Sequence, residues 1–173
     1  MGLWFVWCSC VERLRPAFSR SRTFLWFALA LAAVCVRPDL AGVTSLVRSL
    51  GLKASGYGSL LRLFHSTGFD AHRLARLWTR TALLMLRRHL LQVGRRNVVI
   101  ADGLKIPKAG RKMPGVKKLH QESESNTKPE YIFGHSCQVL ALAVRAARGT
   151  CALPLVGGIH EGVVFSNRDR RTL

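Results

Sequence analysis

Acidic side chains are scarce in this sequence. Its 173 residues include 9 Asp and Glu but 27 Lys and Arg, which gives a net charge of +18 at neutral pH. A surface with this excess repels itself unless an anion shares it, and nucleic acid and an acidic membrane surface are the suitable anions. An arginine-rich composition can also reflect codon usage alone. The charge therefore favours a polyanion-binding protein, with nucleic acid as the first candidate.

Paired cysteines are also lacking. None of the five cysteines belongs to a CxxC motif and their number is odd, so the sequence indicates neither a zinc site nor a disulfide framework. We expect reduced, buried thiols in a cytoplasmic protein.

Apolar runs of membrane-spanning length are absent as well. Residues 23–36 are free of charge, but this stretch is shorter than the roughly twenty residues that a spanning helix needs. A buried core helix is the favoured interpretation. A secretory signal or a membrane anchor remains open, because basic residues precede the apolar stretch.

Helical periodicity dominates the first half of the chain. Apolar residues at helical spacing predict helices over 43–50 and 55–64, separated by Gly51, which is typical of a helix-turn-helix or of an ordinary helical hairpin. Asp70 is expected to cap a third helix that ends at Gly94. The arginines of that helix suit either a solvated face or a phosphate-contacting one.

Strand patterns replace helical ones after Asn97. The β-branched run that ends at Asp102 predicts a central strand covered on both sides, followed by a long loop over 105–130. Further strands are expected over 131–144 and 150–157, and Pro154 indicates an edge position or a bulge in the last one. The fold class is therefore α+β.

Asp102 is the candidate catalytic and metal-binding residue. Phosphate-loop, HExxH and GxSxG motifs are absent. Asp102 instead precedes a run of cations, of which Lys105, Lys108 and Lys112 are the candidate contacts to a DNA backbone. A carboxylate in such a setting is suited to a divalent ion that a phosphate also touches. The alternative is that Asp102 and Gly103 simply begin a turn.

The segment "VVIADGLKIPKAGRKMPGVKKLHQESESNTKPEYIFGHSCQVLALAV" resembles the first catalytic block of DDE-type insertion-sequence transposases, and "LPLVGGIHEGV" resembles the strand that follows. Upstream, "LRPAFSRSRTFLWFALAL" and "VRPDLAGVTSLVRSLGL" are similar to the helical domain of these enzymes. The resemblance covers residues 14–173. It implies a helical DNA-binding domain over 14–95, and over 96–173 the first three strands of an incomplete RNase H-like domain. Residues 1–13 lie outside the resemblance and are expected to be a poorly ordered leader.

The resemblance also implies the chemistry. Three acids of the family bind two Mg²⁺ ions for in-line attack on a phosphodiester. Asp102 matches the first acid, and no later acid ends an apolar strand, so we expect a transposase fragment without cleavage activity and without stably bound Mg²⁺. His135, in the Gly-His motif, either orients substrate or packs. Duplex DNA at transposon ends and an intact transposase are the implied partners. A membrane-associated protein anchored by residues 23–36, and a pseudogene product that scarcely folds, are the alternatives.

Overall fold

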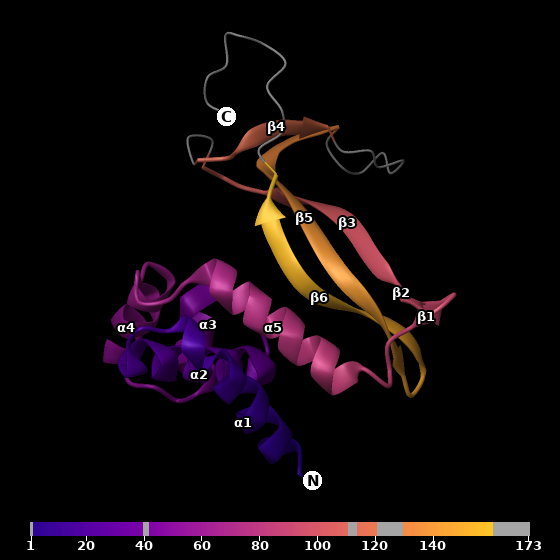
Figure 1. The fold of residues 1–173 in the computed structure, drawn as a ribbon. Coiled ribbons are helices and arrows are strands. Elements are labelled where there is room, and N and C mark those ends of the chain that lie inside the picture. Colours follow the sequence, from indigo (N-terminus) through magenta and orange to yellow (C-terminus); the bar gives the residue numbers. More distant parts are fainter. Residues whose placement is uncertain (1, 40–41, 111–113, 121–129, 161–173) are drawn as a thin grey trace. The chain divides into compact units, whose positions relative to one another are not determined.

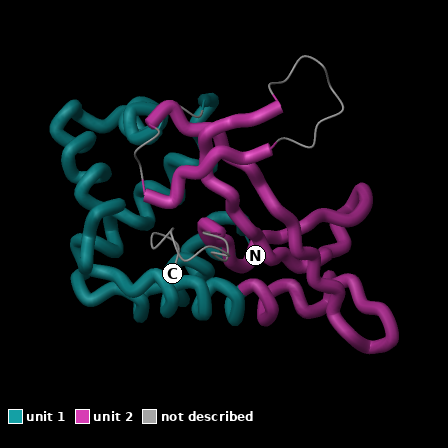
Figure 2. The backbone as a smooth tube through the Cα atoms, turned by 90° about the horizontal axis from the view of Figure 1, so that it is seen from above, with its two compact units in different colours: residues 1–81 teal, residues 82–173 magenta. Residues whose placement is uncertain are grey.

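The computed structural model describes residues 2–39, 42–110, 114–120 and 130–160. Two compact units divide the chain, residues 1–81 and residues 82–173, and each is described here by itself (Figure 2). Helices form the first unit and strands the second, apart from helix α5, which crosses the boundary (Figure 1). The fold is α+β, as the sequence predicts.

The helices are α1 (Leu3–Leu14), a short 3₁₀ turn (Arg15–Ala17), α2 (Ser21–Val36), α3 (Gly42–Ser49), α4 (Ser55–Phe64) and α5 (Ala71–Leu86). The strands are β1 (Gln92–Val93), β2 (Arg96–Asn97), β3 (Val99–Pro107), β4 (Lys117–His120), β5 (Tyr131–Ala146) and β6 (Gly149–Ile159).

Helix α2 supplies side chains to both hydrophobic clusters of the first unit. Ala30 and Ala33 pack with buried leucines of α3 and α4, and Phe24 packs in a second cluster with Phe18 and Val11. The charge-free stretch over 23–36 is therefore a helix that packs one face into the core, while Leu25, Val34 and Val36 on it are exposed. Among the described residues, no helix has both the length and the apolar character that crossing a membrane requires.

The first residues of the chain are helical, whereas the sequence interpretation placed a poorly ordered leader there. Helix α1 buries Val11 and Leu14, and Trp7 packs against the Phe18 cluster. Sequence reasoning missed this helix because the outer residues Leu3 and Phe5 remain exposed, so the apolar pattern is not confined to one face.

The turn between α3 and α4 depends on Gly51. Its φ of 60° lies in the left-handed region, and the Leu52 N–H donates to the Val47 carbonyl at 3.0 Å. This is the six-to-one hydrogen bond of a Schellman ending. The two predicted helices on either side of Gly51 are confirmed, and both contribute leucines to the same core.

Helix α5 begins as predicted but ends earlier. The Arg73 N–H donates to the Asp70 carboxylate at 2.9 Å, and this bond, with the charges of His72 and Arg76 nearby, lowers the pKa of Asp70. The helix ends at Leu86 rather than at Gly94. Gly94 and Arg95 both have positive φ and form the two-residue turn of the β1–β2 hairpin, a geometry that favours a type I′ turn over a helix end.

The centre of the sheet is β5, not the strand that carries Asp102. β5 pairs antiparallel with β3 along one edge and with β4 and β6 along the other. All nine residues of β3 are exposed, so the prediction of a central strand covered on both sides is wrong. The predicted loop over 105–130 contains the end of β3 and the whole of β4. Pro154 lies on edge strand β6 beside a register shift, as predicted.

The cysteines carry no disulfide among the described residues. The expectation of buried thiols is wrong, because Cys35 and Cys151 are exposed and the other three cysteines are only half-buried. Cys35 lies in the exposed last turn of α2, and Cys151 lies in the exposed first part of β6.

Candidate nucleic-acid interface

Asp102 lies in the middle of β3, opposite Val139 of β5. Its carboxylate is exposed and accepts the N–H of Gly103 at 2.7 Å. The strand continues for five residues beyond it. The sequence interpretations placed Asp102 at the exit of a strand or at the start of a turn, and both are therefore wrong about the backbone. The Asp102 side chain is nevertheless accessible to solvent.

His135 lies on the same face of the sheet as Asp102 but at a distance. Alternation places Asp102, Val139 and His135 on one face, and the four residues from Val139 to His135 correspond to about 13 Å of strand. The His135 ring is 9% exposed, and its Nε2 donates to the Pro114 carbonyl at 2.9 Å. This contact favours the packing role for His135, because it fixes the segment before β4 against β5.

The described carboxylates do not assemble around Asp102. Glu130 is the one acid after Asp102 in the described part of the chain, and about 30 Å of strand separates it from the position opposite Asp102. Ligands of one Mg²⁺ ion lie about 2 Å from it. Among the described residues no three His, Cys, Asp or Glu side chains cluster for a metal. These residues therefore do not fit a two-metal centre, and the remaining acids, Glu122, Glu124, Glu161 and Asp169, lie outside the described residues.

The candidate lysines are not grouped around Asp102. Lys105 is three residues from Asp102 and so lies on the opposite face of β3, with its Nζ donating to the His120 carbonyl at 2.7 Å. Lys108 is half-buried, and its N–H donates to the Phe133 carbonyl at 2.9 Å. Lys112 lies outside the described residues.

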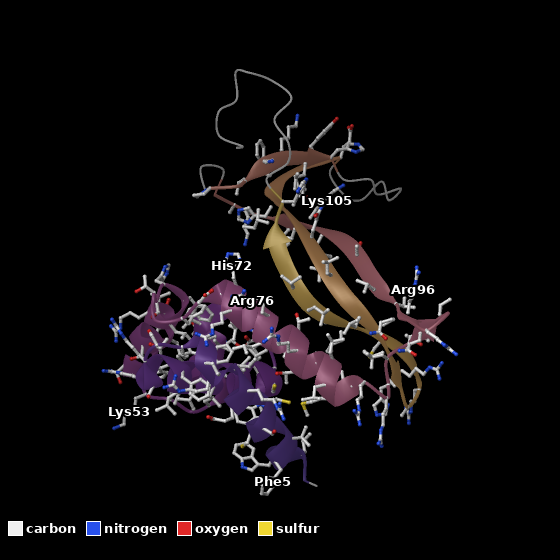
Figure 3. All side chains as sticks on the ribbon, in the orientation of Figure 1. Phe5, Lys53, His72, Arg76, Arg96 and Lys105 are labelled. Carbon is white, nitrogen blue, oxygen red and sulfur yellow. The ribbon has the colours of Figure 1, made fainter. Side chains whose placement is uncertain are left out.

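Cations gather instead where β3 ends and β4 runs along β5. We call this group the basic tip; it consists of Lys105, Lys108, Lys117 and Lys118. The Lys118 Nζ lies 4.3 Å from the centre of the Tyr131 ring, and the His120 ring meets the same tyrosine edge-on at 5.2 Å. Lys105 is labelled near this end of the sheet in Figure 3.

The chemistry of the basic tip suits a nucleic-acid backbone. Lysine ammonium groups attract phosphates, and an exposed aromatic ring among them offers a stacking surface. Glu130 is the acid nearest to it in the described sequence, with an oxygen 3.7 Å from the His120 Nε2. The sequence interpretation included the lysines but missed Tyr131 and His120. The sequence pattern that could have indicated these two residues is the alternation of the short strand Lys117–His120, which pairs with the start of β5.

A second basic surface lies on α5. Arg73, Arg76 and Arg80 are exposed and follow one another at spacings of three and four residues, which places them on one helical face over about 10 Å. Figure 3 shows His72 and Arg76 on the same side of this helix. The helix has no acid in its first turn. Both alternatives that the sequence left open for this helix, a solvated face and a phosphate-contacting face, require this exposure.

No family model, curated protein or solved structure matches the chain. A proposal for its function is therefore based on the charges and contacts of the described residues and on the sequence resemblance.

Proposed function

We propose that this chain binds duplex DNA through backbone phosphates, as a transposase-like protein that does not cleave DNA by itself. The observation that carries the proposal is the basic tip, where four lysines lie at one end of the sheet and one of them, Lys118, contacts the exposed ring of Tyr131. Lysines placed in this way neutralise phosphates without reading sequence.

The order of the strands supports an RNase H-like assignment of the second unit. β3, β5 and β6 follow one another as an antiparallel meander, and the first of them carries Asp102. This is the arrangement that the resemblance to DDE transposases leads us to expect. In an intact enzyme of that kind Asp102 corresponds to the first metal-binding acid.

The positions of the described carboxylates support the proposal of binding without cleavage. In-line attack on a phosphodiester by the two-metal route needs several acids within a few ångströms of one another. Asp102 has Val139 opposite it and no described acid within reach. The lysines and arginines still attract DNA, so the proposed activity is binding, with an intact transposase or transposon ends as partners.

Removing two lysines of the basic tip tests the proposal. We expect the Lys105→Gln/Lys118→Gln variant to bind a 25-base-pair duplex roughly tenfold more weakly than the wild type, because it loses contacts to phosphates. Each lost contact should also reduce the slope of log affinity against log salt by about one. Fluorescence anisotropy of a labelled duplex measures both quantities.

The matched control is Arg13→Gln/Lys53→Gln. It removes the same charge from exposed positions of α1 and of the turn before α4. Its salt slope should stay close to that of the wild type. Equal losses in the two double variants would show that net charge alone, rather than the basic tip, determines binding.

A further inference from the structure

The first unit contains an arginine-lined pocket between the start of α2 and the end of α4. Its volume is about 340 Å³. The pocket is lined by Arg20, Arg22, Thr23, Trp26, Ser59, Arg62, Leu63 and Ser66. Three guanidinium groups and three hydroxyl groups therefore meet in one concavity, with the buried Leu63 and the half-buried Trp26 as its apolar wall.

Among the described residues, no Asp or Glu lines this pocket. The aspartates described in the same unit are engaged elsewhere: Asp39 pairs with Arg48 at 2.9 Å, and Asp70 caps α5. Three cations held in a concavity without a lining acid repel one another, and an anion relieves that repulsion. The positive charge of the pocket therefore favours the binding of an anionic ligand.

The hydroxyl groups are placed to donate to such an anion. The Ser66 Oγ accepts the Gly68 N–H at 2.9 Å, which leaves its own proton for another acceptor. The Thr23 Oγ1 lies close to it, since a Cβ added to Gly68 would be 2.8 Å from the threonine oxygen and 2.9 Å from that of Ser66. On α4, the Ser59 Oγ lies 3.3 Å from Arg62 Nη2 and accepts from it, so this hydroxyl also helps to hold the guanidinium.

We propose that this pocket binds a phosphate group, and that in the proposed function the group is a phosphodiester of the DNA backbone. Arginine forks match the paired oxygens of a phosphate, and hydroxyl donors complete its hydrogen bonds. The start of α2 adds unpaired N–H groups, because no side chain caps it. The three arginines are exposed, and Arg62 is held by Ser59.

The pocket and the helical pair around Gly51 are parts of one structure. α4 carries Ser59 and Arg62 on the pocket side and Leu60 and Leu63 in the core shared with α2 and α3. A phosphate held here fixes the position of α4 on the duplex, which is what a backbone contact does for a DNA-binding helix pair.

The variant Arg22→Gln/Arg62→Gln tests this proposal, which rests on the proposed DNA binding. We expect duplex affinity to fall about thirtyfold and the salt slope to shrink by about one, while the equal-charge control Arg13→Gln/Lys53→Gln loses less than about threefold. Thr23→Val, which removes one hydroxyl and no charge, should cost about fivefold. Circular dichroism melting curves establish whether each variant folds. If the arginine variant does not fold, Thr23→Val alone tests whether the pocket binds a phosphate.

The outcomes separate the two proposals. If the wild type binds duplex with a steep salt slope and both pocket variants match the control, the pocket proposal is wrong and the proposed function stands. If the wild type does not bind duplex, the proposed function is wrong. Titration with inorganic pyrophosphate, followed by the NMR signal of the Trp26 indole N–H, distinguishes the source: a response in the wild type without duplex binding assigns the pocket to free phosphate compounds and overturns the DNA assignment.

Discussion

Raising the salt concentration from 50 to 200 mM is expected to weaken duplex binding by about a thousandfold. The expectation follows from the number of phosphate contacts. About six contacts from the exposed lysines and arginines of the described residues give a slope of log affinity against log salt near −5. A fourfold rise in salt then lowers the affinity by about three orders of magnitude. Anisotropy titrations at four salt concentrations measure the slope directly.

A second ligand provides the control for the salt experiment. A single-stranded oligonucleotide of the same length should give a shallower slope, because each contact on single strands releases fewer counterions, about 0.7 instead of 0.9 per phosphate. A duplex affinity that does not change with salt would contradict the view that backbone phosphates provide the binding energy.

Replacing Gly134 with alanine is expected to destabilise the sheet by about 3 kcal/mol or more. Gly134 is buried and pairs with Pro107 of β3 and Lys117 of β4. An added Cβ would overlap the Ile106 carbonyl oxygen and would lie 2.9 Å from the Ile106 carbonyl carbon and 3.1 Å from the Pro107 Cα. These are backbone atoms of the paired strand, so relief requires the strands to separate. The melting temperature followed by circular dichroism should fall by more than about 10 °C.

Gly158→Ala is the matched control for this substitution. Gly158 lies on β6, pairs with Gln138 of the same central strand, and has no atom within 4 Å of an added Cβ. Its melting temperature should stay within a few degrees of the wild type. A Gly134→Ala protein as stable as Gly158→Ala would show that β3 does not lie against β5 as the structure has it.

The helical half of the fold was predictable because its signals are local. Gly51 marks a left-handed turn, and Asp70 offers a cap to the N–H groups of the helix that follows, as its contact with Arg73 shows. Neither signal needs information from elsewhere in the chain. The end of α5 was mispredicted because Gly94 is equally suited to a hairpin turn, and only the pairing of β1 with β2 distinguishes the two.

The sheet was less predictable because the environment of a strand depends on its partners. The apolar run before Asp102 suggested a strand covered on both sides, yet β3 is an exposed edge strand. The separation of Lys105 from Asp102 follows from strand alternation, once the strand is known to continue beyond Asp102. The pocket of the first unit joins residues that are about forty positions apart, and no sequence spacing indicates such a site.

A plasmid assay with Mg²⁺ tests the central claim most directly: that Asp102 lies apart from the other described acids and that the chain binds DNA without cutting it. Supercoiled plasmid is incubated with the purified chain, and retardation and nicking are read from the same gel. We predict that the wild type and Asp102→Asn retard the plasmid equally and that neither nicks it. Mg²⁺-dependent nicking by the wild type that disappears in Asp102→Asn would contradict the claim.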